Sequence, residues 1–122
     1  MDIVPLTVWR EARSEGEQGM LAVYWVITNR SIQSGRGWSS NPERVSLQAN
    51  QFDCWNTHDL QRDKYPALGD NAYKLAVAIC AQPGADPTAG ATAYYDISIP
   101  APSWATPDNF RVQIGKLRFH RV

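Results

Sequence analysis

The sequence predicts an α+β fold that is mainly helical and carries a small β-sheet at one edge. Apolar residues recur at helical spacing within residues 5–32 and 71–81. Segments rich in small, β-branched and aromatic residues follow only later, at 91–96 and 110–119. No repeat, low-complexity tract or linker interrupts the chain. We therefore expect residues 1–122 to form one catalytic domain.

The first helix is expected over residues 5–13, where Leu6, Trp9 and Arg10 share one side and Arg13 follows Trp9 by one turn. A second helix is expected from near Glu15 to about Ile32, because residues 14–17 match the S-x-x-E capping box. In that box Ser14 accepts from the Glu17 amide, and Glu17 reaches back to the Ser14 amide. The predicted buried face consists of Met20, Val23, Ile27 and the stem of Arg30, widened by Trp25 and Val26.

The middle of the chain is predicted to be rich in loops. The segment 34–37, Ser-Gly-Arg-Gly, ends the second helix, and residues 38–66 are punctuated by Pro42 and Pro66. One short helical turn is expected at 45–49. The aromatic and polar cluster Gln51-Phe52-Asp53-Cys54-Trp55 shows no clear period.

A third helix is expected over about 71–81, capped by Asp70 and ended by Pro83-Gly84. Its inner face is predicted to consist of Ala72, Leu75, Ala76 and Ile79. One strand is expected at 91–96. A second is expected within 110–119, with Val112, Ile114 and Leu117 as apolar members and Gly115 as a bulge or turn.

Composition limits the classes of partner. Lys plus Arg and Asp plus Glu both number 12, so the net charge is zero and gives no reason to expect nucleic-acid or membrane binding. The N-terminus lacks the basic region of a signal peptide, and no apolar run approaches the ~20 residues of a membrane span. We expect a chain made in a host cytoplasm without a signal peptide, which is a monomer.

Metal and thiol chemistry are poorly supported. Only His58 and His120 are available, and with Cys54 they match no usual zinc spacing, so neither a metal nor a cofactor is expected. A Cys54–His58 nucleophile pair is conceivable, but a packed cysteine and an exposed histidine explain these residues better. Cys54 and Cys80 are expected to be free, partly buried thiols.

Glu11 is the strongest candidate for acid–base chemistry. It lies near the end of the first predicted helix, two residues after Trp9. Glycoside cleavage needs a carboxylic acid that keeps its proton, and burial against aromatic groups provides such an acid. Spacing alone favours a solvated glutamate or a partner of Arg13 or Arg30. Glu15, one turn later, is an open candidate for a supporting role.

Aromatic residues in or beside loops suit carbohydrate binding, because sugar rings stack their C–H faces on aromatic side chains. They are Trp38, Phe52, Trp55, Tyr94, Tyr95 and Trp104. Half or more of them are expected to belong to the core. Sugar hydroxyls could be bound by Asn29, Gln51, Asn56 and Asn109.

Several motifs occur together in a fixed order and resemble the cell wall hydrolases of the SleB/CwlJ type, the spore-cortex-lytic enzymes and their phage relatives. The motifs are W-R-E-A-R-S-E-G-E at 9–17, G-M-L-A-V at 19–23, V-I-T-N-R at 26–30, Q-F-D-C-W at 51–55, D-P-T-A-G-A-T-A-Y-Y at 86–95, P-S-W at 102–104 and I-G-x-x-x-F at 114–119. The resemblance covers nearly the whole chain. Asp53 stands where the family has Ser, and Leu117 stands where the family usually has His.

The resemblance implies a lysozyme-like fold related to lytic transglycosylases, with Glu11 as the sole catalytic acid/base and peptidoglycan glycan strands as the substrate. Our candidates for the substrate groove are Asn29, Gln51, Phe52, Tyr94, Tyr95 and Trp104. Arg13, Glu15 and Arg30 are expected to support the site, with Arg30 paired to a carboxylate such as Glu15.

Two other functions stay open. A muramidase would deliver water to the same bond, and a wall-binding module would have lost catalysis together with the family histidine. For the setting, we expect a phage or prophage endolysin that acts on the wall, in the periplasm, after release by a holin.

Overall fold

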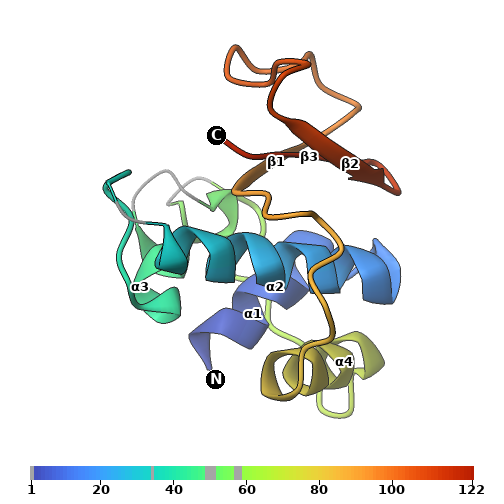
Figure 1. Cartoon of the computed structure of the whole chain (residues 1–122). Coiled ribbons are helices and arrows are strands. Elements are labelled where there is room, and N and C mark those ends of the chain that lie inside the picture. Colours follow the sequence, from blue (N-terminus) through green and yellow to red (C-terminus); the bar gives the residue numbers. More distant parts are fainter. Residues whose placement is uncertain (1, 34, 49–51, 57–58) are drawn as a thin grey trace.

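The computed structural model describes residues 2–33, 35–48, 52–56 and 59–122, and it shows helices stacked beneath a small sheet (Figure 1). The fold is α+β and mainly helical, as predicted. Its elements are α1 (Ile3–Ala12), α2 (Gly16–Ile32), α3 (Pro42–Leu47), the short 3-10 helix η1 (Asp53–Trp55), α4 (Asn71–Ala81), β1 (Ala93–Asp96), β2 (Phe110–Ile114) and β3 (Leu117–His120).

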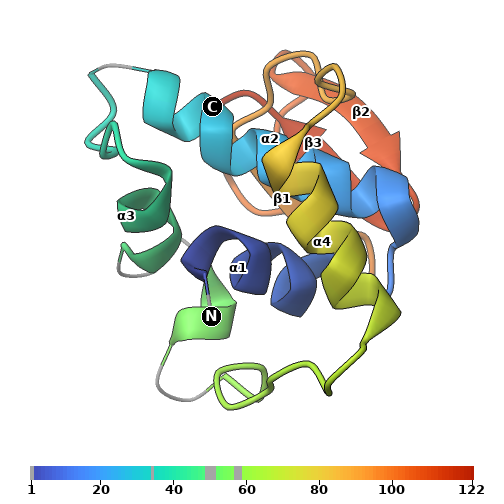
Figure 2. The same ribbon diagram turned by 90° about the horizontal axis from the view of Figure 1, so that it is seen from below.

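Helix α1 lies at the centre of the helical layer, between α3 and α4 (Figure 2). It begins at Ile3, two residues before the predicted start. Pro5 lies in its first turn, where a backbone N–H has no helical acceptor. The lack of an N–H in proline therefore removes no hydrogen bond from the helix. The helix ends at Ala12, and the Arg13 amide donates to the Trp9 carbonyl at 3.0 Å.

The predicted capping box is wrong. Helix α2 begins at Gly16, and the flanking residue is Glu15, whose side chain makes no capping hydrogen bond. The chain turns sharply here, because Gly16 has a φ of 75° and the Glu15 amide donates to the Ala12 carbonyl at 2.9 Å. A glycine in the left-handed region replaces the side-chain cap. Ser14 therefore lies outside the capping position.

The rest of the α2 prediction is confirmed, apart from one side chain. The helix ends at Ile32, and Met20, Val23, Val26, Ile27 and Arg30 are buried. Trp25 is only half-buried, and its indole nitrogen donates to the Gly84 carbonyl at 3.0 Å.

Helix α3 lies three residues earlier than the predicted turn at 45–49. Asn41 caps it, since its side-chain oxygen accepts from the amides of Glu43 at 2.9 Å and Arg44 at 3.2 Å. Pro42 takes the first helical position, where proline is favoured. The next element, η1, was not predicted, because a single 3-10 turn has no amphipathic period to detect.

Helix α4 has the predicted bounds. The Asp70 carboxylate accepts from the Tyr73 amide at 2.8 Å and from the Trp9 indole at 3.3 Å. One side chain therefore caps α4 and ties it to α1. On the inner face Ala76 and Ile79 are buried, while Ala72 and Leu75 are half-buried against the core.

The C-terminal tail forms two strands where one was expected. Gly115, with a φ of 58°, turns the chain between β2 and β3, and the sheet order is β1-β3-β2 with antiparallel pairing. The pairs Tyr94–Phe119 and Tyr95–Arg118 set the register. Because side chains alternate between the faces of a strand, this register divides the sheet into two chemically different faces.

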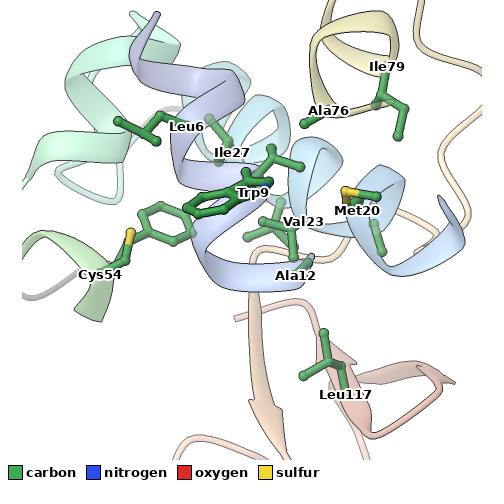
Figure 3. Close-up of a cluster of buried hydrophobic side chains, with 14 of the residues drawn as sticks. Leu6, Trp9, Ala12, Met20, Val23, Ile27, Cys54, Ala76, Ile79 and Leu117 are labelled. Carbon is green, nitrogen blue, oxygen red and sulfur yellow. The ribbon is translucent and has the colours of Figure 1, made fainter. Parts of the chain in front are cut away.

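The inner face of the sheet packs against the helices, and the outer face lies beneath the 97–109 loop. Phe119 and Leu117 lie on the inner face and join one core cluster with residues of α1, α2 and α4 (Figure 3). Trp9 is 5 % exposed and lies in this cluster. Among the described residues, none of the helices combines the length and apolar character that a membrane span requires.

Candidate active site

Glu11 lies at the penultimate position of α1, half-buried, and opens into a groove of about 410 Å³ between the helices and the sheet. The groove is lined by Glu11, Arg30, Tyr94, Tyr95, Asp96, Ile99, Pro102, Trp104 and Leu117. Helix α1 supplies the acid, α2 the cation, and the sheet with its following loop supplies the remaining wall. Segments far apart in the sequence thus meet at one carboxyl group.

The Tyr94 hydroxyl holds the Glu11 carboxyl, because it donates to Oε1. The buried Cys54 thiol lies near the same carboxyl. Burial raises the pKa of both groups, and the charge of Glu11 raises it further. Tyr94 and Cys54 therefore keep their protons, and Tyr94 serves as the hydrogen-bond donor that fixes the carboxyl in the groove.

Arg30 brings a positive charge to the groove. It is 7 % exposed, its Nε donates to the Thr92 carbonyl at 2.5 Å, and its guanidinium lies 4.8 Å from the centre of the Phe52 ring. Burial lowers the pKa of Arg30, while Tyr94 and Glu11 act in the opposite direction. The carboxylate that acts on Arg30 is thus Glu11.

The expected pairing of Arg30 with Glu15 is wrong. Glu15 lies instead against the β2–β3 turn, where a Cβ added to Gly115 would come within 2.8 Å of its Oε2. This contact connects the start of α2 to the hairpin and places Glu15 outside the groove lining.

Two aromatic residues form the wall opposite the helices. Tyr95 and Trp104 both line the groove, with their rings edge-on at 6.1 Å. Asn109 holds this wall, because its side-chain amide donates to the Trp104 carbonyl at 2.7 Å and its oxygen accepts from the Thr106 amide at 3.0 Å. The side chain of Asn109 is therefore hydrogen-bonded within the protein and holds the loop that carries Trp104.

Other predicted groove residues have structural roles. Phe52 is 2 % exposed and lies in the core, so no sugar can stack on it. The Asn29 side chain is hydrogen-bonded to the loop before β1, since its amide donates to Asp86 at 3.0 Å and to the Ala91 carbonyl at 2.9 Å. Gln51 lies outside the described residues.

The remaining aromatic and basic candidates support the helices. Trp55 donates to the Thr7 hydroxyl at 2.8 Å and packs against the core. Arg13 lies 4.3 Å over the Trp9 ring and donates to the carbonyls that end α1, so it stabilises the helix that carries Glu11 without lining the groove. Trp38 is half-buried, 5.4 Å from the Arg30 guanidinium.

Asp96 is a groove residue that was not among the predicted site residues. It lines the groove, and its Oδ1 accepts from the Ser98 amide at 2.8 Å. Hydrogen bonds from the Ser98 amide and hydroxyl, together with the charge of Lys116, lower the pKa of Asp96, so it is ionised at neutral pH. The period of two along β1 would have found it, because residues 94 and 96 share a face.

Leu117 occupies the position of the usual family histidine and lies both in the core and at the groove, 4 % exposed. His120 does not replace that histidine. It lies on the outer face of β3, where its Nδ1 is 2.7 Å from Oδ1 of Asn109 and its ring stacks on Tyr95. The groove of this chain is thus apolar where an imidazole is usual.

Metal and thiol chemistry find no site among the described residues. In that part of the chain, no group of three or more His, Cys, Asp or Glu lies close enough to hold a metal ion. Cys54 and Cys80 are free thiols, as predicted. Cys54 is fully buried near Glu11, and the other member of the considered nucleophile pair, His58, lies outside the described residues.

A helical domain with a small sheet and an acid in the groove between them defines a lysozyme-like class of protein. Residues 14–120 match the family model of the cell wall hydrolases. The chain therefore belongs to the cell wall hydrolase family, in its SleB/CwlJ type, whose members cleave peptidoglycan. Glu11 precedes the matched residues, so its assignment rests on the geometry of the groove.

Two solved structures are similar over almost the whole chain. The catalytic domain of the Bacillus cereus SleB protein is 24% identical with a TM-score of 0.73, covering 98% of this chain and 88% of that one. The catalytic domain of the germination-specific lytic transglycosylase SleB from Bacillus anthracis is 25% identical with a TM-score of 0.74, covering 98% and 92%. No curated protein sequence matches this chain.

Proposed function

We propose that this chain is a lytic transglycosylase that cleaves the β-1,4 bond between N-acetylmuramic acid and N-acetylglucosamine, with Glu11 as the only catalytic acid/base. The observation that carries the proposal is the half-buried Glu11 carboxyl, held by Tyr94 and open to the groove. The similarity to the germination-specific lytic transglycosylase SleB of Bacillus anthracis supports the same reaction.

In the first step, protonated Glu11 gives its proton to the oxygen that links the two sugars. The bond from this oxygen to C1 of the muramic sugar breaks, and positive charge develops on that ring. Glu11 becomes a carboxylate, which the Tyr94 hydroxyl and the nearby Arg30 charge stabilise. General acid catalysis of this kind contributes about 10²–10⁴-fold.

In the second step, the Glu11 carboxylate takes the proton from the C6 hydroxyl of the same muramic sugar. The C6 oxygen then attacks C1 and closes a 1,6-anhydro ring, and Glu11 is again protonated. The nucleophile belongs to the substrate, so one carboxyl group is enough. Tyr95 and Trp104 provide the aromatic wall that would orient the sugar for this closure.

Asp96 favours hydrolysis as a second candidate. An ionised carboxylate in the same groove as the catalytic acid is the arrangement by which inverting glycosidases activate water. In a muramidase of this kind, Glu11 would protonate the leaving oxygen and Asp96 would take the proton of the attacking water.

Mass spectrometry of the digestion products tests the proposal. Transglycosylation leaves anhydro-muramic ends, which lack one water relative to the ends that hydrolysis leaves. We expect anhydro ends from both the native chain and Asp96→Asn. If the native chain leaves reducing ends and Asp96→Asn is inactive, the chain is instead a muramidase.

For the biological setting, we keep the proposal of a phage or prophage endolysin, which rests on the sequence resemblance to phage relatives. Expression in a bacterial host, with and without a holin, tests it. Lysis only when the holin is present would support release through the membrane, and lysis without it would contradict this setting.

A further inference from the structure

A second hollow, of about 330 Å³, lies on the outer face of the sheet, opposite the helices. We call it the outer hollow, and it is lined by Tyr95, Ala105, Thr106, Pro107, Phe110, Arg118 and His120. Its volume lies within the usual range of small-ligand sites. The register explains its composition, because Tyr95, Phe110, Arg118 and His120 belong to pairs that face away from Phe119.

The outer hollow has the chemistry of an anion site. None of the described residues that line it is acidic, and Arg118 supplies a permanent positive charge. The Arg118 guanidinium is held in place 4.2 Å over the Phe110 ring, and its Nη1 donates to Oε1 of Gln113 at 3.1 Å. A guanidinium fixed in this way presents its other N–H groups in the fork geometry that binds a carboxylate.

His120 adds a polar atom for which the protein supplies no partner. The residue is 3 % exposed, and its buried Nε2 has no hydrogen bond. The Asn109 amide donates to the Trp104 carbonyl, so its Oδ1 accepts from His120 Nδ1, and the neutral ring leaves Nε2 as a hydrogen-bond acceptor. Buried polar atoms are nearly always paired, so this unpaired acceptor points to an N–H donor of a ligand, such as a peptide amide beside the carboxylate that Arg118 would bind.

Tyr95 connects the outer hollow to the catalytic groove, because it lines both. It lies on β1, which is an edge strand of the sheet. A branch attached to a sugar in the groove could therefore pass this edge and reach Arg118. In peptidoglycan the muramic acid carries such a branch, a short peptide with free carboxylates.

We propose that the outer hollow binds a carboxylate of the stem peptide carried by the glycan strand in the groove. This inference rests on the proposed function, since it takes peptidoglycan strands as the substrate. Arg118 would give the protein a higher affinity for glycan strands that bear stem peptides than for strands that have lost them.

The test is a binding measurement in the Glu11→Gln background, where the strands are not cut. Glycan strands that carry stem peptides are compared with strands from which an amidase has removed the peptides. We expect peptide-bearing strands to bind about fivefold more tightly, and Arg118→Gln to remove that difference while leaving the affinity for stripped strands unchanged.

The matched control is Arg111→Gln. Arg111 is an exposed arginine of the neighbouring strand β2 that does not line the outer hollow, so the preference should persist. Equal affinity of the parent protein for both kinds of strand, or equal losses on both in Arg118→Gln, would overturn the inference. Failure of the proposed function would appear separately, as absence of cleavage by the chain that retains Glu11.

Discussion

At the scale of single residues, the environment of Glu11 suits a group that is an acid in one step and a base in the next. The Tyr94 hydroxyl donates a hydrogen bond that orients the carboxyl, and it would stabilise the carboxylate once the proton has left. The cation of Arg30 lies close enough to interact with the same charge. Leu117 and the half-buried position of Glu11 partly remove the carboxyl from water.

We predict that Glu11→Gln abolishes lysis. Glutamine preserves the size of the side chain but has no proton to give to a leaving oxygen, so turnover should fall at least about 10²-fold. A turbidity assay on purified sacculi measures the loss, and a pull-down with the same sacculi should show unchanged binding. Glu17→Gln, at an exposed position of α2, is the control and should remain active. Normal lysis by Glu11→Gln would exclude the mechanism.

Tyr94→Phe should lower kcat by about ten- to a hundredfold, because the substitution removes one hydrogen-bond donor from the Glu11 carboxyl. The contact of the ring with Phe119, at 5.5 Å between centroids, is retained, so the thermal midpoint should change little. Tyr95→Phe, on the opposite face of the strand, is the matched control with a smaller expected loss. A large fall in stability with unchanged kcat would show that Tyr94 is only structural.

At the scale of elements, the helices α2, α3 and α4 begin with different capping arrangements, and only some of these can be predicted from the sequence. Asp70 and Asn41 cap α4 and α3 with side-chain oxygens. The start of α2 uses Gly16 at positive φ instead. The S-x-x-E pattern predicted a side-chain cap there, but the close approach of α1 and α2 requires a turn too tight for Ser14 to reach the capping position.

We predict that Asp70→Ala lowers the free energy of unfolding by about 1–2 kcal/mol. The change removes the cap of α4, the usual value of such a cap being about 1 kcal/mol, and it also removes the acceptor of the Trp9 indole. Urea unfolding measures the difference. Asn71→Ala, at the exposed first position of the same helix, should cost much less. Equal losses in the two variants would contradict the capping role.

At the scale of the whole molecule, His120 and Asp86 both make stability depend on pH. Burial and then the charge of Arg118 lower the pKa of His120 below its ordinary value of 6.5. Burial alone would raise the pKa of Asp86, but hydrogen bonds from Thr88, Asn29 and Gly90 lower it below 3.8. His120 contacts Asn109 and so connects β3 to the loop before β2. Asp86 accepts from Asn29 and so connects the loop before β1 to α2.

We therefore predict that acidification destabilises the protein in two stages. The stability due to His120 is complete above about pH 6.5, the unfolded value, and is lost as the pH falls toward the lower folded value. The stability due to Asp86 is complete above about 3.8 and is lost below it. Urea unfolding at about pH 7, 5 and 3 measures both stages. Stability that rises on acidification from pH 7 to about 5 would contradict the His120 assignment.

The sequence by itself determined the helices that have a strong apolar period and the capped helix α4 with its bounds, and its motifs, through the family resemblance, made Glu11 the candidate acid. These features depend on local spacing and on short motifs, which a linear chain displays directly. It also placed Tyr94, Tyr95 and Trp104 among the groove candidates, and the structure brings all three to the groove. Their roles in catalysis and binding stay predictions.

Only the tertiary structure decided which side chains meet. Phe52 and Asn29 looked like sugar-binding residues by type, but packing buries the first and the loop before β1 engages the second. Asp96 and Cys54 reach the groove and Glu11 only because the sheet and η1 fold back onto α1. Burial and long-range hydrogen bonds depend on contacts between distant segments. Sequence spacing determines which face of an element a residue occupies, whereas the fold determines what that face meets.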